Sequence, residues 1–191
     1  MQRFSIFFVL ILGGFMLMGA NGCSSDPNVE GAKLDLRNKD YDRALENIDK
    51  ALQNDPQNAE AYYLKGQVLQ EMAFEVTDPQ EHTQRLNEMV DAYNRAAELD
   101  PEQAEDIRNR VNLAYYNEFQ RGVQAFNRAQ QAEDGTAEFT NAATYFGNAA
   151  TMRPDSIDTY VNQAYALVQA GSTNEAVVAL ETAVDRGDVD A

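Results

Sequence analysis

An apolar motif recurs four times along the chain, and this recurrence narrows the possible folds more than any other feature of the sequence. Each copy has apolar residues at positions i, i+1, i+4 and i+7. The copies begin at Ala44, Met89, Ala142 and Ala176, so that successive starts are 45, 53 and 34 residues apart. Internal repetition on this scale is typical of arrays in which each repeat packs only on its neighbours.

The spacing within the motif predicts amphipathic helices. Apolar residues at these intervals line one helix face, and the alanines allow a close approach between helices. In the first copy, Ala44, Ile48 and Ala51 form this face. Prolines follow the first three copies and end their helices, because the proline ring disfavours helical geometry in the residue before it.

Each motif helix has an expected partner helix upstream. Segments 62–69 and 160–167 share an aromatic–small–large pattern, a third segment includes Gly122 as its small contact residue, and a degenerate first one surrounds Ala32. These helix pairs resemble tetratricopeptide repeats over residues 29–187. The resemblance implies an all-α fold, a tetratricopeptide-repeat α-α superhelix (solenoid) of about four helix pairs. An unrelated helical bundle is the alternative.

Two of the repeats are longer than the 34-residue spacing of the last interval. One insertion lies near residues 75–85, where Asp78 and Pro79 predict a helix end followed by a new helix start. The other lies within residues 104–139, where an unbroken helix is expected over 104–131. Such segments either contribute to binding or are tolerated as surface length, and both interpretations stay open.

In the tetratricopeptide family, the first helix of each repeat lines a concave groove, so the resemblance implies a set of partner-binding residues. Apolar and aromatic side chains at this spacing suit an amphipathic helix or an extended peptide. The same spacing is that of a buried core seam, so both interpretations stay open. The family's carboxylate clamp is not expected, because its Lys and Asn are replaced here. The candidate groove residues are Tyr63, Gln67, Tyr116, Phe119, Val123, Phe126, Val161 and Tyr165.

Residues 1–22 have the features of a secretory signal peptide. The positive charge of Arg3 precedes an apolar run from Phe4 to Met18, and small residues follow it. A bilayer-spanning helix needs roughly 20 apolar residues, more than this run supplies. We therefore expect this segment to direct export and to be removed.

Cys23, the only cysteine, follows the apolar run directly. The segment 17–23 resembles a bacterial lipobox, which implies cleavage before Cys23, acylation of its thiol and a lipidated tether over residues 23–28. This anchor places the chain in the bacterial cell envelope. Ser24 stands where an aspartate would retain a lipoprotein in the inner membrane, which favours the outer membrane facing the periplasm.

The composition disfavours catalysis and nucleic-acid binding. With one Cys and one His, the 191-residue chain has neither a disulfide nor the roughly four ligands of a Cys/His zinc site. A net charge of −16 disfavours nucleic acid, which needs a basic face. No glycine-rich phosphate loop is present. His82 is expected to be solvated, and the carboxylates to lie on turns and outer helix faces. We therefore expect no catalytic residue, no metal and no cofactor.

These features favour a non-catalytic, lipid-anchored scaffold or adaptor that binds another envelope protein or peptide. Two alternatives stay open: a regulatory accessory subunit of a cell-wall enzyme or protease, and a glycan- or peptidoglycan-binding protein. The last motif helix, before a tail at 188–191, has no following helix to cover its apolar residues, so self-association there is a further possibility. Those residues are Ala176, Val177, Leu180, Ala183 and Val184.

Overall fold

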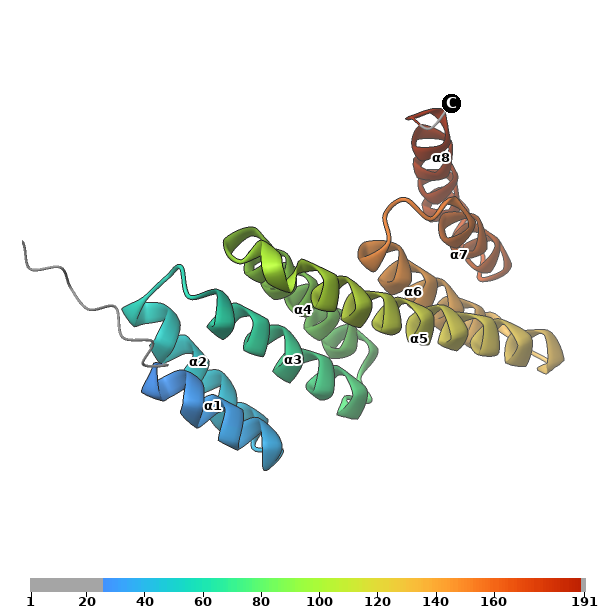
Figure 1. Cartoon of the computed structure of the whole chain (residues 1–191). Coiled ribbons are helices and arrows are strands. Elements are labelled where there is room, and N and C mark those ends of the chain that lie inside the picture. Colours follow the sequence, from blue (N-terminus) through green and yellow to red (C-terminus); the bar gives the residue numbers. More distant parts are fainter. Residues whose placement is uncertain (1–25, 190–191) are drawn as a thin grey trace, which may run out of the picture.

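The computed structural model describes residues 26–189, and all regular structure in that range is helical (Figure 1). α1 lies at one end of the array and α8 at the other. This architecture confirms the predicted all-α solenoid of helix pairs. The elements are α1 (Pro27–Arg37), α2 (Tyr41–Asn54), α3 (Ala59–Glu75), α4 (Pro79–Leu99), the 3-10 helix η1 (Pro101–Gln103), α5 (Ala104–Gln131), α6 (Thr136–Met152), α7 (Ile157–Gln169) and α8 (Thr173–Val189).

Consecutive helices pack as pairs, α1 with α2, α3 with α4, α5 with α6 and α7 with α8. The second helix of each of the first three pairs largely buries the face that the recurring motif predicts. In α2, for example, Ala44, Ile48 and Ala51 are fully buried. The apolar core is accordingly a series of clusters along the array, each shared by neighbouring helices.

Two glycines permit close contacts within pairs. Gly66 of α3 lies against the ring of Tyr93 in α4, and Gly122 of α5 lies against the ring of Phe146 in α6. A Cβ atom on Gly122 would stand only 2.8 Å from ring carbons of Phe146. The structure therefore contains the predicted contact at Gly122, where a small residue lets the two helices approach closely. Gly66 makes the equivalent contact in the preceding helix pair.

The first insertion begins a new helix, as its sequence predicts. α3 ends at Glu75, and the side chain of Asp78 accepts hydrogen bonds from the backbone N–H groups of Gln80 and Glu81. Pro79 occupies the first turn of α4, where its missing N–H costs no helical hydrogen bond. The insertion thus lengthens α4 at its N-terminal end.

The second insertion lengthens α5, which spans the predicted range of 28 residues. α6, its partner, has 17 residues and starts from the C-terminal end of α5. α6 therefore falls about ten residues, or three helical turns, short of the beginning of α5. These first turns of α5 pack against α4 instead, with Ile107 and Val111 joining the core cluster that contains Met89 and Ala96.

Both ends of the array differ from the predicted boundaries. α1 begins at Pro27, inside the predicted tether, because Asp26 caps it by accepting a hydrogen bond from the backbone N–H of Asn28. α8 runs to Val189, so the predicted tail begins within a helix. The predicted signal peptide and Cys23 lie outside the described residues. Within residues 26–189, no helix is long and apolar enough to span a membrane.

The prediction of uncovered apolar residues on α8 is only partly correct. Ala176 and Ala183 are buried, because this alanine face of α8 packs against α7. Val177, Leu180 and Val184 are exposed. The exposed face of α8 is therefore formed by its larger side chains, and its alanines belong to the last helix pair.

Candidate functional site

The exposed large apolar side chains of the described helices are unevenly distributed. Seven lie on the first helices of the pairs, four lie on α8, and α2, α4 and α6 carry none. Since exposed apolar surface marks interaction sites, the first helices have the character of a binding surface. We call these seven residues the first-helix apolar surface. They are Leu34 on α1, Phe74 on α3, Leu113 and Tyr116 on α5, and Ile157, Tyr165 and Val168 on α7.

Two of the predicted groove residues belong to this surface. Tyr116 is 56 % exposed and Tyr165 is 63 % exposed. The other predicted residues all lie on first helices, as the sequence implies, but they are half-buried. Their role in partner binding stays a prediction. They are Tyr63 and Gln67 on α3, Phe119, Val123 and Phe126 on α5, and Val161 on α7.

The two phenylalanines of the predicted stripe have packing partners within the chain. The ring centroid of Phe119 lies 5.3 Å from that of Phe146 in α6 and 5.9 Å from that of Tyr115. Phe126 lies 5.1 Å from Phe139, also in α6. These side chains therefore pack in the seam between α5 and α6, which is the alternative that the sequence leaves open.

Tyr63 connects α3 to α5 through two charged residues. Its hydroxyl donates to Asp106 Oδ2 at 2.5 Å, and Arg110 Nε donates to the Tyr63 oxygen and to Asp106 Oδ2, both at 2.8 Å. The guanidinium also lies over the Tyr63 ring, 5.4 Å from its centroid. Sequence reasoning identified Tyr63 but missed Asp106 and Arg110, whose i, i+4 spacing is the available signal.

These contacts shift the pKa values of the three residues. The hydrogen bond from Tyr63, followed by that from Arg110, lowers the pKa of Asp106. Burial is the main cause that raises the pKa of Tyr63, and its hydrogen bond to Asp106 comes second. Burial acts to lower the pKa of Arg110, but the hydrogen bond to Asp106 and the nearby tyrosines raise it overall. At neutral pH the cluster therefore contains a carboxylate, a guanidinium and a neutral phenol.

A cavity of about 240 Å³ opens beside this cluster, between α1, α3 and α5. Arg37 and Lys39 line it from the end of α1, Gln67 from α3 and Arg110 from α5. Glu71 is the carboxylate among its lining residues. The predicted groove residue Gln67 therefore faces a polar cavity with an excess of positive charge, in a chain whose net charge is −16.

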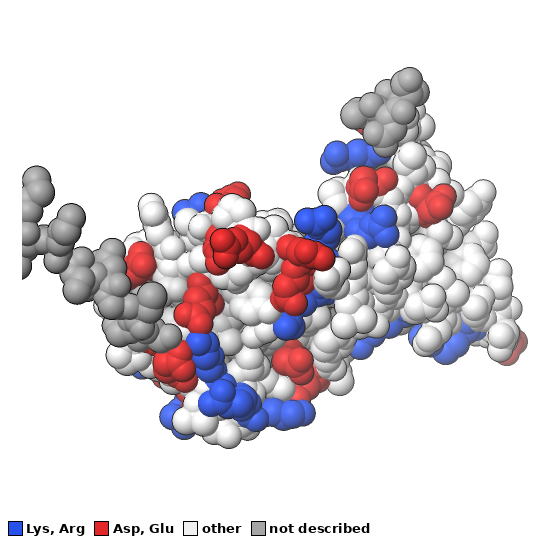
Figure 2. Space-filling model, in the orientation of Figure 1, with Lys and Arg blue, Asp and Glu red and all other residues white. Residues whose placement is uncertain are grey.

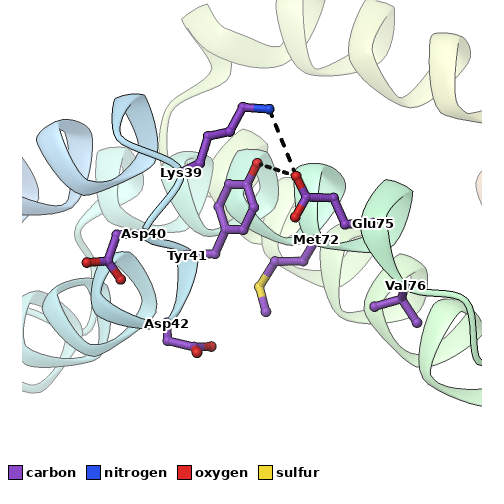
Figure 3. Close-up of a pocket in the computed structure, with 7 residues that line it drawn as sticks. All are labelled: Lys39, Asp40, Tyr41, Asp42, Met72, Glu75 and Val76. Atoms are coloured by element: carbon purple, nitrogen blue, oxygen red, sulfur yellow. Dashed lines mark hydrogen bonds and ion pairs between the residues drawn. The ribbon is translucent and has the colours of Figure 1, made fainter.

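A second cavity, of about 280 Å³, shares Lys39 and Tyr41 with the first (Figure 3). The Tyr41 hydroxyl donates to Glu75 Oε1 at 3.3 Å, and Lys39 Nζ lies 4.0 Å from the same oxygen. Burial, followed by the charge of Glu75, raises the pKa of Tyr41. With Asp40 and Asp42 also lining it, this cavity is predominantly acidic.

His82 is buried, which corrects the expectation that it is solvated. It is 3 % exposed and lies on the buried face of α4. Its Nδ1 lies 2.8 Å from the carbonyl oxygen of Ala73, and because a carbonyl only accepts, Nδ1 donates. Its Nε2 lies 3.0 Å from Glu118 Oε1.

Glu118 corrects the expectation that carboxylates lie on turns and outer faces. It is 1 % exposed, and Asn148 Nδ2 donates to its Oε2 at 3.0 Å. Arg121 Nη1 lies 3.4 Å from Glu118 Oε1 and 3.1 Å from His82 Nε2. This network joins α4, α5 and α6, so its polar groups are satisfied internally. Within residues 26–189, no three His, Cys, Asp or Glu side chains are grouped to hold a metal ion.

Charge is also unevenly distributed along the array. Figure 2 shows many acidic and basic side chains over α1–α4 and a smaller group beside α7 and α8, whereas the surface around α6 and the later part of α5 is largely free of them. The sequence explains this difference, since residues 139–152 and 159–174 contain no Asp, Glu, Lys or Arg. Tyr165 and Val168 of α7 therefore lie in a stretch of sequence without charged residues.

Comparison with known families supports the repeat assignment at the N-terminal end. Residues 29–70, which comprise the first helix pair and most of α3, match the tetratricopeptide repeat family. No curated protein matches the chain.

Several solved structures are similar at low identity. MamA from MSR-1 is 19 % identical, with 86 % of this chain and 77 % of that chain covered and a TM-score of 0.35. YrrB, described as a TPR protein with an unusual peptide-binding site, is 21 % identical over 85 % of this chain and 86 % of its own, with a TM-score of 0.31. A human IFIT1 dimer with PPP-AAAA is 14 % identical, with 83 % of this chain and 47 % of that chain covered and a TM-score of 0.39.

The fold and the surface define an all-α solenoid of tetratricopeptide-type helix pairs with an apolar surface on its first helices. The matched repeat at residues 29–70 agrees with this class. Solenoids of stacked helix pairs bind partners along extended surfaces, which supports a protein-binding scaffold or adaptor role.

Proposed function

We propose that this chain is a lipid-anchored scaffold of the bacterial envelope that holds another envelope protein on its first-helix apolar surface, without catalysing a reaction. The observation that carries the proposal is the uneven distribution of exposed large apolar side chains over the helices. Seven of these side chains lie on the first helices of the pairs and four lie on α8. The second helices of the first three pairs, α2, α4 and α6, carry none. Apolar side chains that are exposed together on a surface are typical of interaction sites.

The surface is suited to an apolar helix or an extended peptide. Tyr116 and Tyr165 are large, rigid and exposed, and tyrosines of this kind are enriched among the side chains that contribute most to binding. The uncharged stretches around α7 lower the cost of removing water from the surface. The partner therefore contacts α5 and α7 with apolar side chains.

The proposed anchor would hold the array close to the membrane. Four residue steps separate Cys23 from Pro27, where α1 begins, and they span at most roughly 14 Å. Among the helices, α1 is then the one held close to the bilayer. The support for the anchor is the lipobox resemblance of residues 17–23.

Site-specific photo-cross-linking in intact cells tests the partner. A photoreactive amino acid replaces Tyr116 or Tyr165, and matched controls replace Gln53 on α2 or Asn87 on α4, which are exposed on second helices. We expect a protein adduct, identified by mass spectrometry, from the first two positions and not from the controls. Equal adducts at all four positions, or none at Tyr116 and Tyr165, would contradict the proposal.

Fractionation tests the anchor separately. We expect the wild-type chain to enter the detergent phase and the outer-membrane fraction, and Cys23→Ala to remain uncleaved or become soluble. A wild-type chain in the aqueous phase removes the lipid anchor from the proposal. Assaying the captured partner with and without this chain separates a scaffold from the alternative, a regulatory accessory subunit.

A further inference from the structure

A cleft of about 520 Å³ lies between the second and third helix pairs. It is formed by the C-terminal ends of α4 and α6, the loop after α6 and the first turns of α5. Those are the turns of α5 that extend beyond α6, so the cleft is a consequence of the insertion in the third repeat. Its lining residues are Asn94, Ala97, Ala104, Ile107, Arg108, Val111, Asn112, Met152, Arg153 and Asp155.

The walls of this cleft combine three kinds of side chain. Five of its residues, including Val111 and Met152, are apolar. Asn94 and Asn112 contribute amide groups, which both donate and accept hydrogen bonds. The charged residues of the lining are two arginines, Arg108 and Arg153, and one carboxylate, Asp155. The cleft therefore combines apolar and polar surface in similar amounts, and its lining carries a net positive charge, although the chain as a whole carries −16.

The two arginines have no carboxylate partner. Nine of the fourteen lysines and arginines within residues 26–189 form ion pairs, whereas Arg108 and Arg153 are among the five that form none. Arg153 is positioned by stacking, with its guanidinium carbon 4.8 Å from the centroid of the Tyr115 ring. The N–H groups of both guanidinium groups therefore remain available to an anionic ligand.

We propose that this cleft binds an acidic peptide segment of a protein partner, with an Asp or Glu carboxylate at Arg108 and Arg153 and a neighbouring apolar side chain on the Val111 and Met152 surface. Guanidinium groups match carboxylates in planar, paired geometry, which gives charge-assisted hydrogen bonds. The amides of Asn94 and Asn112 match the N–H and C=O groups of a peptide backbone. Two cations on an apolar surface are too few for the repeated phosphates of a nucleic acid.

This inference rests on the proposed function, since the peptide in the cleft belongs to a protein partner. It adds a second contact, separate from the first-helix apolar surface, and states the chemistry of that contact. Selection of random twelve-residue peptides displayed on phage, with the full-length chain in detergent as target, tests it. Selected peptides are then made with a fluorescent label, and their affinity is measured by anisotropy. We expect them to carry Asp or Glu next to Leu, Ile, Val or Phe.

The variants are chosen to separate binding from folding. Arg108→Gln removes a side chain that makes no ion pair or hydrogen bond, so it leaves the fold intact, and we expect binding about tenfold weaker, or more in the double variant with Arg153→Gln. Arg186→Gln is the matched control, since Arg186 is also exposed and without an ion pair but lies on α8 and does not line the cleft, and we expect no change. Replacing the selected Glu by Gln in the peptide is expected to have the same effect as Arg108→Gln.

Any of three results overturns the inference: selection yields no acidic–apolar peptides, the peptides bind Arg108→Gln as well as the wild type, or Arg186→Gln weakens binding equally. The cross-linking at Tyr116 and Tyr165 reports separately on the proposed function. If those positions capture a partner while the peptide results fail, only the cleft assignment falls. If they capture none, the proposed function itself falls.

Discussion

Gly66 and Tyr93 approach so closely that no methyl group fits between them, since a Cβ atom on Gly66 would lie 2.5 Å from two ring carbons of Tyr93. Tyr93 is fully buried, and its hydroxyl donates to Gln70 Oε1 at 3.1 Å. The ring is thus fixed both by packing and by a hydrogen bond. This contact sets the distance between α3 and α4.

Gly66→Ala is expected to destabilise the chain by about 1–3 kcal/mol, because the Tyr93 ring has to shift and strain its hydrogen bond. Alanine's higher helix propensity, about 1 kcal/mol, offsets only part of this cost. Urea unfolding followed by circular dichroism measures the change. Gly187→Ala is the control: a Cβ there would lie 3.5 Å from Ile157, an ordinary contact, so equal or slightly higher stability is expected. Similar midpoints for both variants would show that the Gly66 contact is adjustable.

Glu118→Ala is expected to destabilise the chain by about 3–5 kcal/mol, because it leaves His82 and Asn148 buried without their carboxylate partner. Glu133→Ala is the matched control, since Glu133 is exposed and forms no ion pair, and its effect should stay within about 0.5 kcal/mol. The double variant His82→Leu/Glu118→Leu is expected to cost less than its two single changes added together. Additive costs in chemical denaturation would argue against a coupled network.

The Asp106 cluster predicts a specific loss of stability in acid. The pKa of Asp106 is lower in the folded chain than its ordinary value of about 4, so the folded state binds this proton less readily than the unfolded state. The stabilisation is complete above the ordinary value and is lost as the pH falls through the lowered one. Urea midpoints between pH 6 and pH 3 should therefore fall less steeply for Asp106→Asn than for the wild type. Parallel curves would mean that the hydrogen bonds from Tyr63 and Arg110 do not act on this carboxylate.

The buried faces could be predicted from sequence wherever a large residue alternates with alanine at helical spacing, as at Ala44, Ile48 and Ala51. Helical spacing also accounts for the burial of His82. Its neighbours Glu81 and Thr83 are polar, which favours a solvated site, but His82 shares a helix face with Leu86, at i+4. The periodicity of α4 extends into the insertion and places the imidazole inside, so its burial could have been predicted from spacing rather than from local polarity.

Contacts between helices could not be predicted in the same way. α5 carries two candidate stripes that differ by one residue, one through Phe119 and Phe126 and the other through Glu118 and Ala125. Either stripe has helical spacing, and the choice depends on the rotation of α5 relative to α6. The structure buries the second stripe fully and the first partly, because Gly122 admits the Phe146 ring on that side. The partners of Asp106 and the cleft beside Arg108 depend on the same rotation.

Tyr116 and Phe119, one turn apart on α5, are expected to separate binding from folding. Tyr116 is exposed, so Tyr116→Ala should melt within a few degrees of the wild type. If it anchors the partner, its loss costs about 2 kcal/mol or more, which is roughly a thirtyfold loss of affinity. Phe119 packs against Tyr115 and Phe146, so Phe119→Ala should cost about 3 kcal/mol of stability and lower the melting temperature.

Thermal melts and capture of the partner cross-linked at Tyr165 measure the two effects on the same set of variants. Leu113→Ala adds a second exposed position on α5, and we expect it to behave like Tyr116→Ala, with weaker capture and an unchanged melt. The opposite pattern is equally informative. If Phe119→Ala melts like the wild type but loses the partner, the half-buried aromatic stripe of α5 is itself the binding surface, and the partner must displace the packing of Phe119 on α6 when it binds.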